Sequence, residues 1–187
     1  EIGEYAFSEC GFTRIKLPAN LEHISECMLA QCKYLRQVEF PAKLKTIGNH
    51  AFLMCVGLNS VEIPEGVTSI GEGAFAQCGN YTVWGSYYSS SSFTSVKLPS
   101  TIQTIGANAF NWCTSLRTIN IPGKTVEIGN RAFSYCYKLS NVTFEWSVPK
   151  LANDIFDICR DTTITCYYPS NNPEWTADKL QNYKAYN

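Results

Sequence analysis

The strongest constraint on the fold is a short motif, Ala-Phe-x-x-Cys, that returns along most of this chain of 187 residues. The cysteine of the motif occupies seven positions: Cys10, Cys32, Cys55, Cys78, Cys113, Cys136 and Cys159. Subtracting these numbers gives spacings of 22, 23, 23, 35, 23 and 23 residues. Self-similarity at a fixed period indicates stacked repeat units. We therefore expect about seven coils of 23 residues, with 12 extra residues in the fourth.

Each unit combines two hydrophobic periods. Segments such as Val61-Glu62-Ile63-Pro64 alternate apolar and polar residues, which is typical of a strand with one buried face, and the proline ends that strand. The Ala-Phe-x-x-Cys-x-x-Leu segment places apolar residues three apart, which predicts a short helical or 3₁₀ turn. Because so short a unit cannot bury its apolar side alone, the coils must stack, with parallel strands about 4.8 Å apart.

The segment IGNHAFLMCVGLNSVEIPEGVTSIG, residues 47–71, resembles the BspA-like type of leucine-rich repeat, found in surface proteins of bacteria and some protists. The resemblance covers about residues 1–166. It implies an α/β fold: a right-handed leucine-rich-repeat solenoid with one parallel strand and one short helical or 3₁₀ turn per coil. The pattern departs from commoner leucine-rich repeats because Pro follows the strand and Cys precedes it, so only the architecture carries over from those.

The domain organisation follows from where the repeat stops. We expect a solenoid over residues 1–166, with an insertion loop at about 80–92 in the fourth repeat. Residues 167–187 drop the pattern, and Trp175, Leu180 and Tyr183 can share a helical face that begins near Pro173. Because an open terminal coil needs covering, this segment is expected to be a C-terminal cap. The chain opens within a repeat at Glu1, so we expect further repeats upstream.

The nine cysteines allow three interpretations. Seven share one repeat position, and Cys166 is assigned to the inward strand position held elsewhere by Ile63 and Leu98, which favours small buried apolar residues. Disulfides between coils require particular Cβ geometry, and an odd number leaves one thiol out. Zinc sites of the usual kind require paired Cys-x₂₋₄-Cys knuckles, and the pair Cys27 and Cys32 has no counterpart. We expect free buried thiols, with no metal and no cofactor.

Cys27 is the exception, because it occupies the position just before the Ala-Phe pair. The residues at that position are polar and variable, which predicts a location near the surface, and His50 holds it in the next coil. A Cys–His pair begins a nucleophilic arrangement, but no third group to orient the base can be named. Patterns such as GxSxG, HExxH and the P-loop are absent from the sequence. A non-catalytic protein is expected, with a cysteine-dependent enzyme as a remote alternative.

Charge and hydropathy exclude two classes of partner. The net charge of −1 and the isoelectric point of about 6.2 provide no field that would attract nucleic acid. No stretch of the sequence approaches the ~18 uninterrupted apolar residues of a membrane span. We expect neither nucleic-acid binding nor membrane insertion.

Two regions are candidate binding surfaces. The outward strand positions are polar without a dominant sign and continue to Thr165 in the last repeat; they could present a flat face to a protein or glycan, or be plainly solvated. The candidates on this face are Arg14, Lys16, Gln37, Glu39, Glu62, Lys97, Asn120 and Thr143. The insertion loop has the Tyr, Trp, Ser and Gly composition of antibody loops, although its aromatics could instead fold back on the coils. Its candidates are Tyr81, Trp84, Tyr87 and Tyr88.

The family resemblance implies a secreted or cell-surface location and a role in adhesion. The expected function is therefore a non-catalytic recognition or adhesion module for a protein or glycan, such as a host extracellular or surface protein. The alternative is a structural spacer that presents another domain of a longer chain. The sequence leaves the oligomeric state open.

Overall fold

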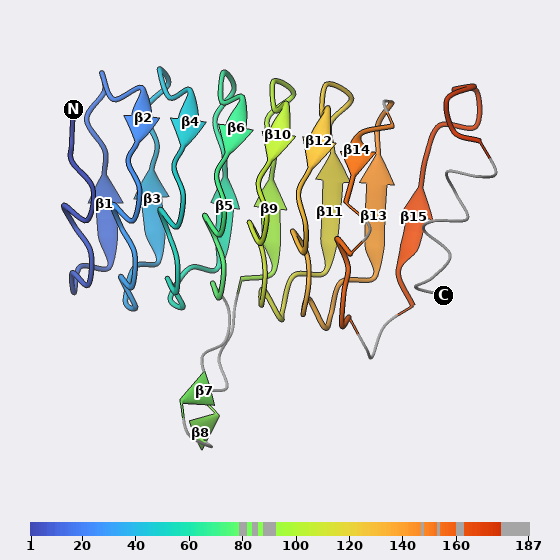
Figure 1. Cartoon of the computed structure of the whole chain (residues 1–187). Helices are drawn as coiled ribbons and strands as arrows, with labels where there is room; N and C mark the ends of the chain where they lie inside the picture. Colours follow the sequence, from blue (N-terminus) through green and yellow to red (C-terminus); the bar gives the residue numbers. More distant parts are fainter. Residues whose placement is uncertain are drawn as a thin grey trace.

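The computed structural model describes residues 1–78, 93–146, 148–152, 154–159 and 163–176, and the backbone of residues 82–83 and 86–87. The coils follow one another in sequence order along one solenoid, with the N-terminus at one end (Figure 1). The hairpin of β7 (Thr82–Val83) and β8 (Ser86–Tyr87) is antiparallel and projects from the fourth coil, away from the stack (Figure 1).

Each complete coil carries two strands, one on each of two faces (Figure 1). The strand face is formed by β1 (Arg14–Lys16), β3 (Gln37–Glu39), β5 (Ser60–Glu62), β9 (Ser95–Lys97), β11 (Thr118–Ile121), β13 (Asn141–Phe144) and β15 (Thr165–Tyr167). The second face is formed by β2 (His23–Ile24), β4 (Thr46–Ile47), β6 (Ser69–Ile70), β10 (Thr104–Ile105), β12 (Glu127–Ile128) and β14 (Lys150–Leu151). Strands pair in parallel with the equivalent strand of the next coil.

Three features of the predicted coil require correction. The second face adds a strand to each coil, where the sequence predicted one strand per coil. None of the residues that the structure describes is helical, so the predicted helical or 3₁₀ turn is wrong. Six coils with a strand on each face are complete within the described residues, and β15 belongs to an incomplete seventh coil. The parallel solenoid itself is confirmed.

Left-handed residues explain why the Ala-Phe segment is not helical. In the third coil, His50 has φ of 54° and Met54 has φ of 59°, and the same two positions are left-handed in neighbouring coils. Two separate turns result: the Leu53 N–H donates to the His50 carbonyl at 3.0 Å and the Cys55 N–H to the Phe52 carbonyl at 3.2 Å. A left-handed residue reverses the chain twist, so these turns cannot merge into a right-handed helix. Apolar spacing alone could not reveal this.

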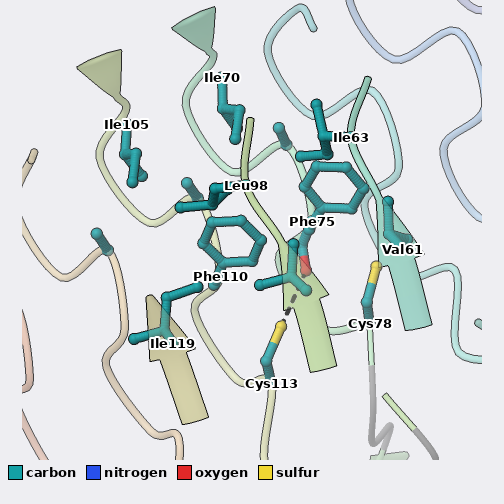
Figure 2. Packing of buried hydrophobic residues seen from close by; sticks show 14 of the residues in the cluster. Val61, Ile63, Ile70, Phe75, Cys78, Leu98, Ile105, Phe110, Cys113 and Ile119 are labelled. Carbon is teal, nitrogen blue, oxygen red and sulfur yellow. Dashed lines mark hydrogen bonds between the residues drawn. The ribbon is translucent and has the colours of Figure 1, made fainter. Parts of the chain in front are cut away.

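The core is built from columns of equivalent side chains. The rings of Phe75 and Phe110 stack at 5.5 Å with an interplanar angle of 1° (Figure 2). Val61 and Ile63 from the strand face and Ile70 from the second face close around the Phe75 ring (Figure 2). The full phenylalanine column comprises Phe52, Phe75, Phe110, Phe133 and Phe156.

The cysteine column lies beside the phenylalanines and contributes hydrogen bonds as well as volume. The Cys113 thiol donates to the carbonyl of Phe75 in the preceding coil at 3.2 Å (Figure 2). Cys32, Cys55, Cys78, Cys136 and Cys159 donate in the same way, at 3.0 to 3.3 Å. All nine cysteines are free, and most are buried, as expected. Burial raises the pKa of Cys78 to about 12, so its thiol stays protonated at neutral pH.

The last coil differs from the expected register. Cys166 pairs with Val142, so it holds the first inward strand position and not the one held by Ile63 and Leu98. Pro169 then falls where the first five coils have their strand-ending proline. The sequence prediction placed this strand two residues too early because the Thr163–Ile164–Thr165 triplet has the polar–apolar–polar alternation of a strand. The repeat pattern of the seventh coil therefore ends two residues closer to the C-terminus than predicted.

Beyond β15, the chain packs against the sixth coil. The Trp175 ring lies 5.1 Å from the ring of Phe144 and 5.2 Å from that of Tyr168. The Trp175 indole N–H donates to the Trp146 carbonyl at 3.2 Å. Leu180 and Tyr183, the other members of the predicted cap, lie outside the described residues. Among the described residues, no helix has the length and apolar character needed to span a bilayer.

Candidate interaction surface

The strand face presents the polar residues that its alternation predicts. The eight candidates on it are all exposed, while the Val and Ile residues between them point inward, as the apolar–polar alternation requires. Parallel register stacks each side chain on its counterpart in the next coil: Arg14 lies beside Gln37 and Asn120 beside Thr143. In the seventh coil the matching position is held by Tyr167 and not by Thr165, which pairs with Asn141.

Charged neighbours on this face neutralise one another. The Lys16 ammonium lies 3.6 Å from the Glu39 carboxylate, and that of Lys97 lies 2.5 Å from Glu62. The Glu62 carboxylate, through its hydrogen bond and charge, raises the pKa of Lys97. All four side chains are well exposed, so each pair adds little stability. Their arrangement instead sets a pattern of charge along the face.

The strand-face sheet is interrupted between β3 and β5. β1 and β3 form a two-stranded sheet, while β5, β9, β11, β13 and β15 form a separate five-stranded one. The Leu17 N–H donates to the Glu39 carbonyl at 3.1 Å, and the Ile63 N–H donates to the Lys97 carbonyl at 3.0 Å. None of the described hydrogen bonds joins Phe40 to Glu62 in the corresponding way. On the second face β4 and β6 stay paired, so the stack opens on one side only.

The cause of the interruption lies in the core beneath it. The second coil has Leu29 where the third has Phe52, so the phenylalanine column stops at Phe52. Phe40 fills the space beside it, edge-on to Phe52 at 5.9 Å. Most equivalent strand positions hold smaller residues, such as Leu17 and Ile63; Phe144 holds it in the sixth coil, where the sheet stays paired. We therefore attribute the separation of β3 from β5 to the combination of Phe40 with Leu29, which lets the Phe40 ring turn toward the end of the column.

A groove of about 590 Å³ opens at the interruption. Val38 and Phe40 contribute half-buried apolar surface, and Arg14 and Arg36 contribute cations from the N-terminal side. The lining residues are Thr13, Arg14, Arg36, Gln37, Val38, Phe40, Asn59, Ser60, Val61 and Glu62. Sequence reasoning identified Arg14, Gln37 and Glu62 but missed the groove. The signal was the pairing of two exceptions, Leu29 in the phenylalanine position and Phe40 in a leucine position.

Most of the second candidate surface, the insertion loop, lies outside the described residues. Tyr81, Trp84 and Tyr88 lie outside the described residues, and Tyr87 is described only as backbone in β8. In the fifth and sixth coils lies an aromatic cluster that sequence reasoning did not single out. The ring of Trp112 stacks on that of Tyr135 at 4.2 Å, and Tyr137 meets Tyr135 edge-on at 6.2 Å. The 23-residue separation of Trp112 and Tyr135 was the signal available for this cluster.

The structure brings Cys27 and His50 together, as the register predicted, but in a different setting. Cys27 is buried, so the prediction of a near-surface position is wrong for it; its small thiol lies close to the side chains of Glu26 and His50, whereas the larger Tyr5 at the equivalent position of the first coil is 58% exposed. None of the described hydrogen bonds joins Cys27 to His50, so the nucleophile–base contact of a cysteine enzyme is not formed.

Comparison with known proteins identifies the repeat. The model of the BspA type leucine rich repeat region, which has 6 copies, matches residues 1–85 and 83–176. Comparison with curated protein sequences gives no match.

Solved structures agree with that match. A leucine-rich repeat protein from T. pallidum superposes with a TM-score of 0.66 at 27% identity, covering 76% of this chain and 64% of that one. One from Bacteroides ovatus gives 0.48 at 27% identity, covering 86% and 55%. Only the first likeness, with a TM-score above 0.5, extends to the overall shape of the solenoid. The chain spans less than two thirds of the length of either structure. From the matched repeats, which cover most of the sequence, we conclude that this chain belongs to the BspA-type leucine-rich repeat family.

Proposed function

We propose that this chain is a non-catalytic recognition module of a secreted or cell-surface protein, and that it binds an extended segment of a protein partner in the groove between β3 and β5. Leucine-rich repeat arrays generally mediate protein interactions, and members of this family are often surface or adhesion proteins. The observation that carries the proposal is the interruption of the strand-face sheet above that groove.

An extended peptide suits the backbone chemistry of the groove. β3 and β5 each pair with a neighbour on one side only, so each presents an open strand edge toward the other. Strand edges recruit extended segments through main-chain hydrogen bonds, while alternate side chains of the guest provide specificity. The volume of 590 Å³ lies within the range of roughly 300–1,000 Å³ that is typical of ligand sites.

The side chains of the groove define the partner further. Arg14 and Arg36 lie on one side, and Arg forms paired hydrogen bonds with carboxylates. Glu62, on the other side, already has Lys97 as an ion-pair partner. Val38 and Phe40 offer an apolar floor. This combination favours a segment with an acidic residue next to an apolar one, as would occur on an extracellular protein of a host.

The remaining parts of the function extend this proposal. The loop aromatics Tyr81, Trp84, Tyr87 and Tyr88 stand as a second contact region for a protein or glycan, because their composition suits adaptable recognition. The segment after β15 acts as the C-terminal cap, so the boundary between solenoid and cap falls after Tyr167 and not after residue 166 as predicted from the sequence; the contact of Trp175 with Phe144 supports this role. The family match supports secretion or surface display. Leucine-rich repeat folds are typically non-catalytic, which favours recognition over catalysis by Cys27.

A peptide-display selection on the immobilised chain tests the proposal. We expect enriched peptides to combine acidic and apolar residues and to lose at least about tenfold in affinity on Arg14→Glu and Arg36→Glu, because both changes replace a groove cation with a carboxylate that repels the acidic guest. Lys150→Glu is the matched control, since it reverses an exposed cation on the second face, where Lys150 lies 3.6 Å from Glu127. Phe40→Leu should close the groove and abolish binding.

The alternative of a structural spacer predicts a different outcome. A spacer would enrich no peptide whose binding depends on groove residues, and Arg14→Glu would behave like Lys150→Glu. Enriched peptides that bind equally well to the groove variants would likewise overturn the groove as the binding site. Binding that disappears only when Tyr81–Ser92 is deleted would assign recognition to the loop instead.

A further inference from the structure

Three side chains from two neighbouring coils converge beside the turn edge of the solenoid. Glu26 and Cys27 lie in the turn that follows β2, and His50 lies in the turn that follows β4. One potential ligand atom from each, a carboxylate oxygen, the Cys27 sulfur and an imidazole nitrogen, all lie within 4.8 Å of one another. Neither the strand face nor the groove includes any of these residues.

The backbone holds the three residues in place. The Tyr5 N–H donates to the Glu26 carbonyl at 3.2 Å, the Cys27 N–H to the Asn49 carbonyl at 2.9 Å, and the His50 N–H to the Glu72 carbonyl at 2.7 Å. Cys27 and His50 both adopt left-handed backbone, with φ of 52° and 54°, so their side chains leave equivalent points of adjacent coils. The convergence therefore comes from the repeat geometry and needs no folding of a loop.

Room for the imidazole comes from Gly73, the next residue in the same column. A Cβ at Gly73 would lie 2.7 Å from His50 Cδ2 and 2.8 Å from Nε2. Other coils tolerate a side chain at this position, such as Asn108 and Arg131, so the backbone itself does not demand glycine. Gly73 leaves the space into which the His50 ring extends.

The chemistry of the three groups suits one kind of ligand. Thiolate sulfur, imidazole nitrogen and carboxylate oxygen are the donors that Zn²⁺ takes in proteins, and sites with three protein ligands keep a fourth position for water. The three groups are not hydrogen-bonded to one another in the described structure, which leaves their lone pairs available. Zinc bond lengths of about 2.0–2.3 Å put neighbouring donors roughly 3.5 Å apart, within a small rotation of the exposed Glu26 side chain.

Tyr5 supplies an outer partner. Its phenol shares a hydrogen bond with the Cys27 sulfur, and this bond raises the pKa of Tyr5. A donor that hydrogen-bonds to a ligand sulfur orients it and stabilises its negative charge, as outer-shell groups do at metal sites.

We propose that Glu26, Cys27 and His50 form a binding site for a Zn²⁺ ion that bridges the second and third coils of this chain, with Tyr5 as outer-shell hydrogen-bond partner. The ion links the turns of adjacent coils and so stabilises the N-terminal part of the solenoid. Binding displaces the thiol proton of Cys27 and leaves the fourth position for a water molecule.

Metal titration of the full chain, kept reduced, tests the site directly. Zn²⁺ binding is measured by competition with a chromophoric chelator, and Co²⁺ substitution reports sulfur ligation through a thiolate-to-cobalt charge-transfer band. We expect one equivalent to bind, the Co²⁺ spectrum to show the sulfur band and four-coordinate geometry, and Zn²⁺ to raise the melting temperature.

Variants separate a metal site from a purely structural role. Cys27→Ala and His50→Asn should weaken Zn²⁺ binding by about 100-fold or more, because loss of an outer-shell partner alone costs about 10- to 100-fold. Asn is chosen because it tolerates left-handed backbone, as Asn108 does in the same column. The melting temperature without metal shows whether each variant is folded.

The matched control is the double variant Glu22→Gln and His23→Asn, which removes an exposed imidazole from strand β2 and an exposed carboxylate from the residue before it. It should bind Zn²⁺ like the parent chain. The proposal is overturned if the parent takes up no stoichiometric Zn²⁺, if the Co²⁺ complex lacks the sulfur band, or if the control loses affinity as much as folded His50→Asn.

Discussion

Single side chains in this protein act through their position in a column. A thiol at the Cys78 position fills a small space and donates to the Phe52 carbonyl at 3.0 Å, which gives that buried carbonyl a second hydrogen bond beside the one from the Cys55 N–H. Gly106 is needed because it has no side chain: an added Cβ would lie 2.6 Å from the Gly71 carbonyl carbon of the preceding coil. Each role recurs because each coil meets its neighbour in the same way.

The buried thiols predict a loss of stability in alkaline solution. Burial raises the pKa of Cys78 from 9.0 to about 12, so the unfolded chain releases this proton at lower pH than the folded chain. The stabilisation is complete below about pH 9 and is lost as the pH rises toward 12. Urea unfolding between these pH values should show falling stability, and Cys78→Ala should flatten the slope. An unchanged slope in that variant would contradict the buried-thiol assignment.

Individual elements of the coil are short, and their turns depend on left-handed residues that are not glycine. Gln31 is one of these, with φ of 59°. Left-handed backbone costs roughly 1–2 kcal/mol for a residue with a side chain. These positions persist because backbone hydrogen bonds between coils hold them, such as that from the Gln31 N–H to the Leu53 carbonyl at 2.6 Å.

Substitution by glycine should therefore have opposite consequences at two glutamines. Gln31→Gly relieves left-handed strain and should leave stability unchanged or raise it by up to about 1 kcal/mol. Gln103→Gly, at an exposed site without positive φ, should lower stability by about 0.5–1 kcal/mol through backbone entropy. Chemical denaturation of both variants gives the comparison. Equal losses at the two sites would show that the left-handed turn carries no strain.

The whole molecule is a stack in which each coil contacts mainly its neighbours. Such an array is sensitive at its ends and tolerant of insertions between strands. The described contacts of Trp175 lie at the C-terminal end, and the hairpin of β7 and β8 extends from the fourth coil (Figure 1). Two predictions follow from this linear organisation.

Trp175→Ala should destabilise the protein by about 3–5 kcal/mol, the usual cost of truncating a buried aromatic residue. Amide hydrogen exchange should quicken at β13 and β15 while β2 and β4 keep their protection, because the array frays from the end that loses its cover. Trp146→Ala is the control, since that side chain is 54% exposed. Uniformly faster exchange along the stack would argue against local fraying.

Deletion of Tyr81–Ser92 should leave the solenoid intact. It removes 12 residues, so the spacing of Cys78 and Cys113 falls from 35 to the standard 23. The pairing of Val61 with Val96 involves no loop residue, and shortening the connection between two strands slightly lowers the entropy cost of closing it. Circular dichroism and thermal unfolding should match those of the parent chain. A collapse of the fold would show that the insertion packs on the coils.

The sequence alone determined the stacking of the coils, the inward columns of Phe, Cys, Ile and Val, and the exposed strand residues, because a strict period repeats the same inside and outside positions in every coil. It indicated helical turns wrongly, since apolar spacing does not report the sign of φ at His50 or Met54. Only the tertiary structure decided the gap between β3 and β5 and the approach of Glu26 to the Cys27–His50 pair that the register had predicted. Both depend on how the side chains of two adjacent coils fit together, and an average repeat holds no information about such a pair of exceptions.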